Sequence, residues 1–521
     1  MRNNRLTPWL LPAAAFAVAL FGAVVRPVWH DELYTLALAR LPVAELTHAL
    51  HIDSGPPLHY LICHLIFVAV GWAEGSPLGT MLVRLPSVLA YALIPRVVMG
   101  AKSGLGERFT WGPLLAIAWL PLLYFGTEAR AYALLALIHT TLWLLGPAWI
   151  ERGGGRLAGF VVLAASLPLL HYTGVASFVM LPALAFFVPG RRRRRLALAL
   201  GLAAIPALLW LPMMLGAPEE SMAWVWKASG PGRPGLATAE VLAPAGPFPA
   251  FVGAGPSVVP GGFSLAVLAL LVAGAVAGAV GLVRLRSTED TTLRLAARAG
   301  LGLLPWSMLI VLGAGGIPVY FAGRTEAMIW AVAATLIAAV CTQLPRNLGT
   351  VVMGPYIAIG FMTIGLWLVH LPSSPPAPGV FVGRRLATEV ADGDRVVVAG
   401  LWQLEVRHGL AEAYLRSPPG AAKLVSVGTV PRTQSLHPGW LDRSALFSNG
   451  LLEEAVRLRN EAASHGNRIW LIRSPILPFD RNFFPAFVGW RRAQVFSSPV
   501  IAVDVLDPQR SEAVPADEVE Y

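Results

Sequence analysis

Residues 8–25 read PWLLPAAAFAVALFGAVV, and residues 29–35, three positions further on, read WHDELYT. An apolar run of about 18 residues is long enough to cross a bilayer. The basic residue Arg2 precedes this run and no small-residue cleavage site follows it. We therefore expect an uncleaved signal anchor rather than a signal peptide that is removed. The adjacent acids Asp31 and Glu32 then lie at the membrane face, directly after the first span.

The composition predicts that most of the chain lies in a membrane. Of its 521 residues, 55% are hydrophobic and only 13% are charged, whereas soluble proteins carry roughly 25% charged residues. A water-soluble fold cannot hide this much apolar surface, so the bilayer must be the solvent. The net charge of +10 comes largely from short arginine clusters between apolar runs. Such clusters are typical of membrane topology and not of a nucleic-acid-binding surface.

Apolar runs near the length of one span recur along the first 370 residues. We place them at 8–25, 84–100, 111–126, 131–150, 157–170, 174–188, 196–215, 263–283, 299–315, 325–344 and 350–370. Residues 58–72 are ambiguous. If they do not span and the N-terminus is cytoplasmic, the arginine-rich loops fall inside, as the positive-inside rule requires. The sequence thus predicts an all-α polytopic protein of about eleven transmembrane helices, with an interfacial or re-entrant helix at 58–72.

The character of the chain changes after residue 370. A proline-rich link ends the last span, and short β-branched runs then alternate with helical patterns. This pattern predicts a small C-terminal α/β domain outside the membrane. We expect a transmembrane domain at 1–370, a linker at 371–383 and the soluble domain at 384–521. Richness in Ala, Arg, Gly and Pro with few Lys indicates a GC-rich bacterial genome. The soluble domain is then periplasmic or extracellular, on a multi-pass inner-membrane protein.

Ionisable residues gather on the predicted outer side. Asp31 has two readings: the N-cap of an interfacial helix that runs to Arg40, or a catalytic carboxylate at the membrane face. The double proline before Leu58 fixes a turn into an apolar helix, where a lipid-phosphate head could rest. Arg84 can pair with a phosphate or extend its charge to the interface.

Three further motifs fall on the same side. They are Glu128-Ala129-Arg130-Ala131-Tyr132, His171-Tyr172-Thr173-Gly174 and Arg324-Thr325-Glu326. A turn role explains His171, and a local ion pair explains Arg324 and Glu326, when each is taken alone. Their convergence on one face favours a functional site, because ionisable groups near the bilayer are costly unless they are paired or used.

The motifs in this order resemble the GT-C glycosyltransferase superfamily. They are Asp-Glu after the first span, Pro-Pro-Leu-His-Tyr at 56–60, Arg-Leu-Pro-Ser at 84–87 and Glu-Ala-Arg-Ala-Tyr at 128–132. The chain is most similar to the branch of protein O-mannosyltransferases, aminoarabinose transferases and Rgt-type galacturonosyltransferases. The resemblance covers residues 9–200 well and the later spans loosely. It implies a sugar donor on a polyprenyl phosphate and an inverting transfer at the outer face to an acceptor hydroxyl, on a lipid, glycan or protein.

The resemblance also implies roles for particular residues. Asp31 becomes the general base on the acceptor hydroxyl, with Glu32 and Glu128 as supporting catalytic acids. Arg84, Arg130 and Arg324 become candidates to hold the donor phosphate. Substrate-lining positions are His51, Asp53, His59, Tyr60, Tyr132, His171 and Tyr172. Some members of the family use a divalent metal, for which Asp31 and Glu128 are the candidate ligands.

Two features leave alternatives open. Family members often have Arg-Tyr where this chain has Arg324-Thr325, which weakens the role of Arg324. A transporter or flippase of a lipid-linked substrate is the competing class. It would usually have two related halves and broken helices at mid-membrane, whereas this chain has no internal repeat and its acids lie at one face.

Overall fold

The computed structural model describes most of the chain, with several gaps. The described residues are 7–53, 55–101, 111–216, 291–314, 324–343, 346–399, 402–418, 423, 425–429, 450–475 and 483–508. They fall into two compact units that do not follow chain order. We call the first the helical unit (Met1–Arg26, Leu50–Ile62, Met81–Ser374) and the second the α/β unit (Pro27–Ala49, Cys63–Thr80, Pro375–Tyr521).

The helical unit is built from apolar helices that match the predicted spans. Its helices are α1 (Thr7–Val25), α5 (Pro77–Gly100), α6 (Trp111–Ile117), α7 (Leu120–Gly126), α8 (Tyr132–Arg152), α9 (Gly155–Leu170), α10 (Tyr172–Met180), η2 (Leu181–Phe186), α11 (Gly190–Leu215), α16 (Thr291–Leu301), α17 (Leu304–Ala314), α18 (Arg324–Ala327), α19 (Trp330–Thr342), α20 (Arg346–His370) and η3 (Leu371–Ser373). Several predicted spans are therefore two shorter helices in sequence. The predicted span 263–283 lies outside the described residues.

Within the described residues, five helices are long and apolar enough to cross a membrane, or up to six when a broken pair counts as one span. They lie in α5, α8, α11, α16 with α17, and α20. Four shorter apolar helices accompany them. The predicted polytopic helical fold is confirmed, and the count of about eleven stays a prediction. Helix α4 (Leu58–Val70) has 13 residues, which is fewer than the roughly 20 that a span requires.

The helical core is packed around two tryptophans. Trp119 precedes α7 and Trp330 begins α19, and their rings stack with centroids 4.4 Å apart. Both side chains are fully buried. Helix α8 is mostly buried among its neighbours, whereas α11 exposes leucines such as Leu209 along its length. An exposed apolar face on a helix of this length is typical of contact with lipid.

The α/β unit carries a five-stranded sheet of order β2-β1-β3-β5-β4. The strands are β1 (Arg395–Ala399), β2 (Ser426–Thr429), β3 (Ile469–Arg473), β4 (Arg491–Ser497) and β5 (Ala502–Asp507), and the helices of the C-terminal segment are α21 (Pro378–Glu389), α22 (Gln403–Arg416), α23 (Gly450–Ala463) and η5 (Phe484–Phe487). Strands β2, β1 and β3 run parallel, and β5 pairs antiparallel with β3 and β4. This confirms the predicted small α/β fold.

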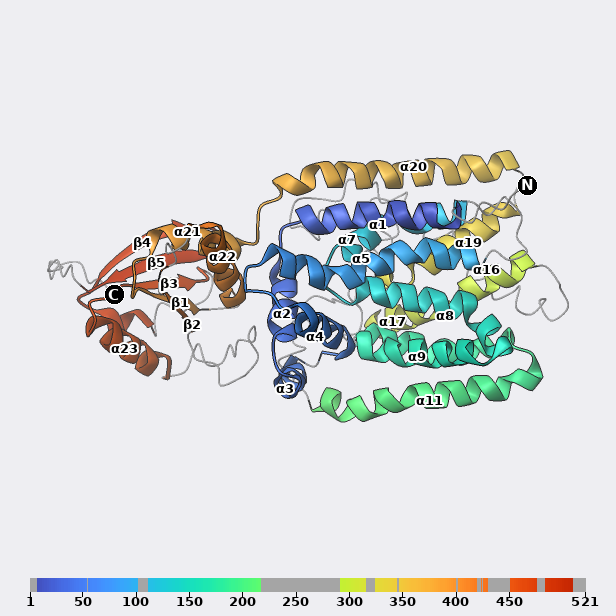
Figure 1. Cartoon of the computed structure of the whole chain (residues 1–521), viewed down its shortest axis with the longest axis horizontal. Coiled ribbons are helices and arrows are strands. Elements are labelled where there is room, and N and C mark those ends of the chain that lie inside the picture. Colours follow the sequence, from blue (N-terminus) through green and yellow to red (C-terminus); the bar gives the residue numbers. More distant parts are fainter. Residues whose placement is uncertain are drawn as a thin grey trace. The chain divides into compact units, whose positions relative to one another are not determined.

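Helices cover both faces of this sheet. Val396 and Val398 of β1 pack with the residues of α21 and α22, whereas Val397 and Ala399 pack with those of α23. Figure 1 shows α21 and α22 on one side of the strands and α23 on the other. Because alternate side chains of a strand point to opposite faces, a run of buried β-branched residues is what a sheet covered on both faces requires.

The same unit includes part of the chain that follows the first span. Helix α2 (His30–Ala39), most of α3 (Val43–Asp53) and the later part of α4 belong to it. Helix α2 contacts α22 of the C-terminal segment. The segment that carries Asp31 therefore shares a compact unit with residues more than 300 positions away in the chain.

Candidate functional site

Arg84 secures the C-terminal end of α1. Its side chain is buried, and one terminal nitrogen donates to the carbonyl oxygens of Ala23 at 2.6 Å and Arg26 at 2.9 Å. The last carbonyls of a helix have no partner inside the helix, so a buried guanidinium is well suited to them. The structure thus gives Arg84 a capping contact in addition to the phosphate-binding role that stays a prediction.

Arg26 is a buried residue that the sequence reasoning did not single out. Its Nη1 donates to the Tyr124 carbonyl at 3.1 Å and to the Thr127 hydroxyl at 3.3 Å. Its guanidinium carbon also lies 3.8 Å from the centre of the Tyr124 ring. Arg26 therefore connects the end of α1 to the end of α7. The available signal was its position directly after a span, where a charge needs partners.

The loop between α7 and α8 carries Glu128 and Arg130. Glu128 is fully buried, and its carbonyl accepts from the backbone N–H of Arg130 at 2.8 Å. The Arg130 carbonyl accepts from the Ser87 hydroxyl of α5 at 2.9 Å. One hydrogen bond within the loop and one from α5 thus fix the backbone of this short loop.

Two arginines are held by tyrosine hydroxyls. Arg130 Nη1 donates to the hydroxyl of Tyr60 at 3.2 Å, and Arg324 Nη1 donates to the hydroxyl of Tyr132 at 3.3 Å. The Tyr132 ring packs against His171, with centroids 5.0 Å apart. We call these five residues the arginine site. Residues of four separate predicted motifs, far apart in the sequence, thus meet in the helical unit.

Two arginines of the arginine site act electrostatically on His171. This residue lies between α9 and α10, where its Nδ1 accepts from the Thr173 backbone N–H at 3.2 Å. Burial, and to a smaller extent the charges of Arg130 and Arg324, lower the pKa of His171 to about 3. The imidazole is therefore neutral at physiological pH. A place where two guanidinium groups disfavour a third positive charge favours an anion such as phosphate.

The remaining predicted lining residues are less closely gathered. His59 is buried and forms a hydrogen bond with the Ala129 backbone, which brings α4 to the loop of Glu128. His51 Nδ1 lies 3.0 Å from the Met213 carbonyl of α11. Tyr172 follows His171 at the start of α10, with ring centroids 6.4 Å apart. Asp53 ends α3, and its side chain lies outside the described part of the structure.

Asp31 and Glu32 lie in the first turn of α2. The helix begins at His30 with Trp29 in the N-cap position, so the reading of Asp31 as the N-cap is wrong. Asp31 is partly buried and its carbonyl accepts from the Thr35 hydroxyl at 3.1 Å, whereas Glu32 is fully buried. Two acids in the first turn interact favourably with the positive end of the helix dipole.

Glu326 lies beside a buried tryptophan. It is fully buried, and its Oε1 accepts from the indole N–H of Trp306 at 3.4 Å. Arg324, two residues earlier, extends to Tyr132 instead. The two neighbouring charges of this motif thus have different surroundings.

A metal site would require several His, Cys, Asp or Glu side chains close together. Across the described ranges, no group of three or more His, Cys, Asp or Glu side chains is placed to hold a metal ion. The candidate ligands Asp31 and Glu128 belong to different units.

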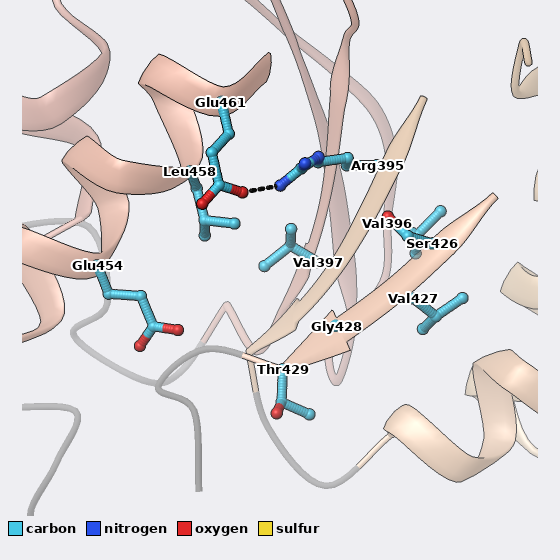
Figure 2. Close-up of a pocket in the computed structure, with 10 residues that line it drawn as sticks. All are labelled: Arg395, Val396, Val397, Ser426, Val427, Gly428, Thr429, Glu454, Leu458 and Glu461. Atoms are coloured by element: carbon cyan, nitrogen blue, oxygen red, sulfur yellow. Dashed lines mark hydrogen bonds and ion pairs between the residues drawn. The ribbon is translucent and has the colours of Figure 1, made fainter. Parts of the chain in front are cut away.

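The α/β unit contains a separate cavity of about 350 Å³. It lies between α23 and strands β1 and β2, and Figure 2 shows the Glu454 carboxylate directed toward it. Arg395 at the start of β1 forms an ion pair with Glu461 on its rim. None of the predicted site residues lines this cavity.

The comparisons with known proteins identify the class of fold. Neither a protein-family model nor a curated protein sequence matches the chain. Among solved structures, the chain is similar to ArnT from Cupriavidus metallidurans bound to undecaprenyl phosphate, with a TM-score of 0.54 and 15% identity over 95% of this chain and 97% of that chain. The apo state of the same protein gives a TM-score of 0.44 over the same shares.

This likeness confirms the predicted fold: the chain has the fold of ArnT, with apolar helices and a small C-terminal sheet.

Proposed function

We propose that the protein is an integral membrane glycosyltransferase. It moves a sugar from a polyprenyl-phosphate donor to an acceptor hydroxyl, with inversion, at the outer face of a bacterial inner membrane. The observation that carries this proposal is the arginine site, where the charges of Arg130 and Arg324 meet at His171. It occurs in a GT-C fold, and the similar solved structure holds undecaprenyl phosphate.

In the proposed reaction Asp31 is the general base. Its carboxylate takes the proton of the acceptor hydroxyl as that oxygen attacks the anomeric carbon of the sugar. The bond from the anomeric carbon to the phosphate oxygen breaks, and its electron pair leaves with the polyprenyl phosphate. A single displacement inverts the anomeric configuration. Glu32 supports Asp31 in the same helical turn, and Glu128 orients the acceptor.

The arginines would act on the leaving group. As the glycosidic bond breaks, negative charge grows on the phosphate, and fixed positive groups stabilise that change more than they stabilise the bound donor. Hydrogen bonds to tyrosine hydroxyls fix the positions of Arg130 and Arg324, which suits them to this role. Arg84 adds a third charge while it holds the end of α1.

We further propose a role for each domain and an orientation of the chain in the membrane. Residues 1–370 form the transmembrane domain, which carries the donor site. Residues 371–383 link it to the soluble domain at 384–521, which lies on the periplasmic or extracellular side. The N-terminus is cytoplasmic. This arrangement follows from the arginine-rich loops of the sequence, which the positive-inside rule places in the cytoplasm.

The test is donor consumption by purified protein in detergent. A panel of polyprenyl-phosphate sugars is offered with an envelope extract as acceptor, and the release of polyprenyl phosphate is measured. We expect the wild type to consume one donor and Asp31→Asn to lose at least about 100-fold of that rate. Glu389→Gln, which removes an exposed carboxylate paired with Arg385, is the control and should keep the rate.

Two other outcomes are informative. An active wild type with an equally active Asp31→Asn keeps the reaction class and removes Asp31 as the base. A wild type that releases no polyprenyl phosphate from any donor, but moves lipid-linked sugar between the leaflets of liposomes, contradicts the transferase proposal and supports a flippase.

A further inference from the structure

The helix that carries the proposed base is attached to the C-terminal segment. Helices α2 and α22 contact each other, and both belong to the α/β unit. No motif of the C-terminal domain predicts a chemical role for it. The contacts within this unit assign it one.

The first contact lies one residue before Asp31. His30 Nδ1 lies 3.3 Å from Glu405 Oε1 in the first turn of α22. The Glu405 side chain is only 5% exposed, and its other oxygen accepts from the Gly379 backbone N–H at 2.8 Å. A buried carboxylate with one oxygen fixed by backbone has little freedom to move, so it can fix His30 in turn.

The packing around Glu405 depends on a glycine. A Cβ at Gly379 would meet the Glu405 side chain at 2.6 Å, closer than real contacts allow. The start of α21 and the start of α22 are therefore in direct contact at this point. Glu405 connects three segments: α2, α21 and α22.

A second contact holds the other end of α2. Glu74 accepts from Arg407 of α22 at 3.0 Å and lies 3.5 Å from Arg40, the C-cap residue of α2. The next residue, Gly75, has a φ of 77° and lies so close to the Glu412 backbone that a Cβ would approach it to 2.5 Å. Both ends of α2 are thus attached to α22, one through Glu405 and one through Glu74.

We propose that Glu405 is a positioning residue for the sugar transfer. It fixes His30, and through it the first helical turn of α2, where Asp31 must meet the acceptor hydroxyl. This inference rests on the proposed function, because it assumes that Asp31 is the base. The physical reason is that proton abstraction needs the base within hydrogen-bond reach, and a displacement of about 1 Å can cost two orders of magnitude in rate.

The test compares four variants in the donor-release assay. Glu405→Ala, His30→Ala and the double variant remove the same contact. Glu412→Ala is the matched control, since Glu412 is also a poorly exposed acid of α22 and pairs with Arg384 at 2.7 Å. We expect Glu405→Ala and His30→Ala each to lower kcat about tenfold, with the KM for donor unchanged. The double variant should lose no more than either single change.

The control separates positioning from general stability. Glu412→Ala should keep the wild-type kcat even where it lowers the melting temperature as much as Glu405→Ala does. The inference is overturned if Glu405→Ala keeps its kcat, if the two losses multiply in the double variant, or if Glu412→Ala loses as much. His30 is 30% exposed, so His30→Ala tests the contact even where Glu405→Ala does not fold.

Hydrogen exchange makes the test independent of the proposed reaction. The amides of α2 should exchange faster in His30→Ala and Glu405→Ala than in Glu412→Ala. Unchanged exchange in α2 contradicts the inference whether or not a donor is consumed. A wild type without donor release, together with faster exchange in α2, contradicts the proposed function alone.

Discussion

The two units use arginine in different ways. In the α/β unit the arginines bind carboxylates: Arg473 and Arg492 both donate to the buried Asp504, at 2.7 Å and 3.0 Å. In the helical unit Arg84 donates to two carbonyl oxygens, and Arg130 and Arg324 each donate to a tyrosine hydroxyl. The residue type is the same, but the acceptors differ in charge.

This difference separates structural arginines from those suited to a ligand. A carboxylate cancels the charge of the guanidinium that it binds, so its pair stabilises the fold and attracts little else. A hydroxyl fixes the geometry of a guanidinium without cancelling its charge. The charges of Arg130 and Arg324 accordingly reach His171 and lower its pKa. The arginines that donate to tyrosine hydroxyls are those proposed to hold the donor phosphate.

The largest expected effect is on the stability of the α/β unit, where arginines bind a buried carboxylate. Asp504→Asn leaves Arg473 beside a neutral amide in a buried place, which costs about 3–5 kcal/mol. We expect the amides of β5 to exchange at least about 100-fold faster in full-length protein. Glu389→Gln, at an exposed ion pair, should change stability by less than about 1 kcal/mol. Equal rates of amide exchange in the two variants would show that Asp504 does not stabilise the sheet.

The second effect is on catalysis. Removing one charged contact to the leaving phosphate costs about 1.5–3 kcal/mol, so Arg130→Gln and Arg324→Gln should each lower kcat/KM for the donor roughly 10- to 100-fold. Arg385→Gln, on the exposed face of α21, should keep the wild-type value. A wild-type kcat/KM in Arg324→Gln would remove Arg324 from the site, as its departure from the family pattern already suggests.

The third expected effect is on stability, through the contact of Arg84 with the C-terminal end of α1. Arg84→Met keeps the apolar stem but leaves the carbonyls of Ala23 and Arg26 without this donor, which costs about 1–3 kcal/mol. We expect a lower melting temperature in detergent. Arg152→Met at the exposed end of α8 is the control and should melt like the wild type. A variant with an unchanged melting temperature and a strongly raised KM for donor would instead support phosphate binding as the main role of Arg84.

The smallest effect concerns pH. Hydrogen bonding to Arg395 is the largest cause that lowers the pKa of Glu461 below its ordinary 4.5. A carboxyl with a lowered folded-state pKa stabilises the protein above its unfolded pKa, and this contribution is lost as the pH falls through the folded value. Glu461→Gln should therefore speed hydrogen exchange in β1 slightly at pH 7. The ratio of variant to wild-type rates should approach one as the pH falls below 4.5. A constant ratio would show that the pair contributes nothing.

Much of the helical fold was predictable because its signals are local. An apolar run forms a helix in lipid since no water is present to bind the backbone, and α1, α8 and α20 fall where such runs were predicted. Breaks such as that between α6 and α7 were missed, because apolar residues continue across them. The N-cap reading of Asp31 failed because His30 already takes a helical conformation.

The candidate site was predictable as a set of residues but not as an arrangement. Arg130, Tyr132 and Arg324 were singled out by their position at the ends of spans. Their pairing with particular tyrosines depends on how α4, α7 and α8 pack, which no local pattern encodes. Arg26 was passed over for the same reason, since its partners lie about 100 residues away in the chain.

The sequence by itself determined that this is a polytopic membrane protein with a small α/β domain and a set of ionisable residues at its span ends. Composition and hydrophobic periodicity are enough for that, because each span satisfies its own backbone hydrogen bonds. Only the tertiary structure decided that α2 belongs with α22, and that Arg130 and Arg324 act on one histidine. The contact of His30 with Glu405 joins residues 375 positions apart, and such pairings arise only when the whole chain packs.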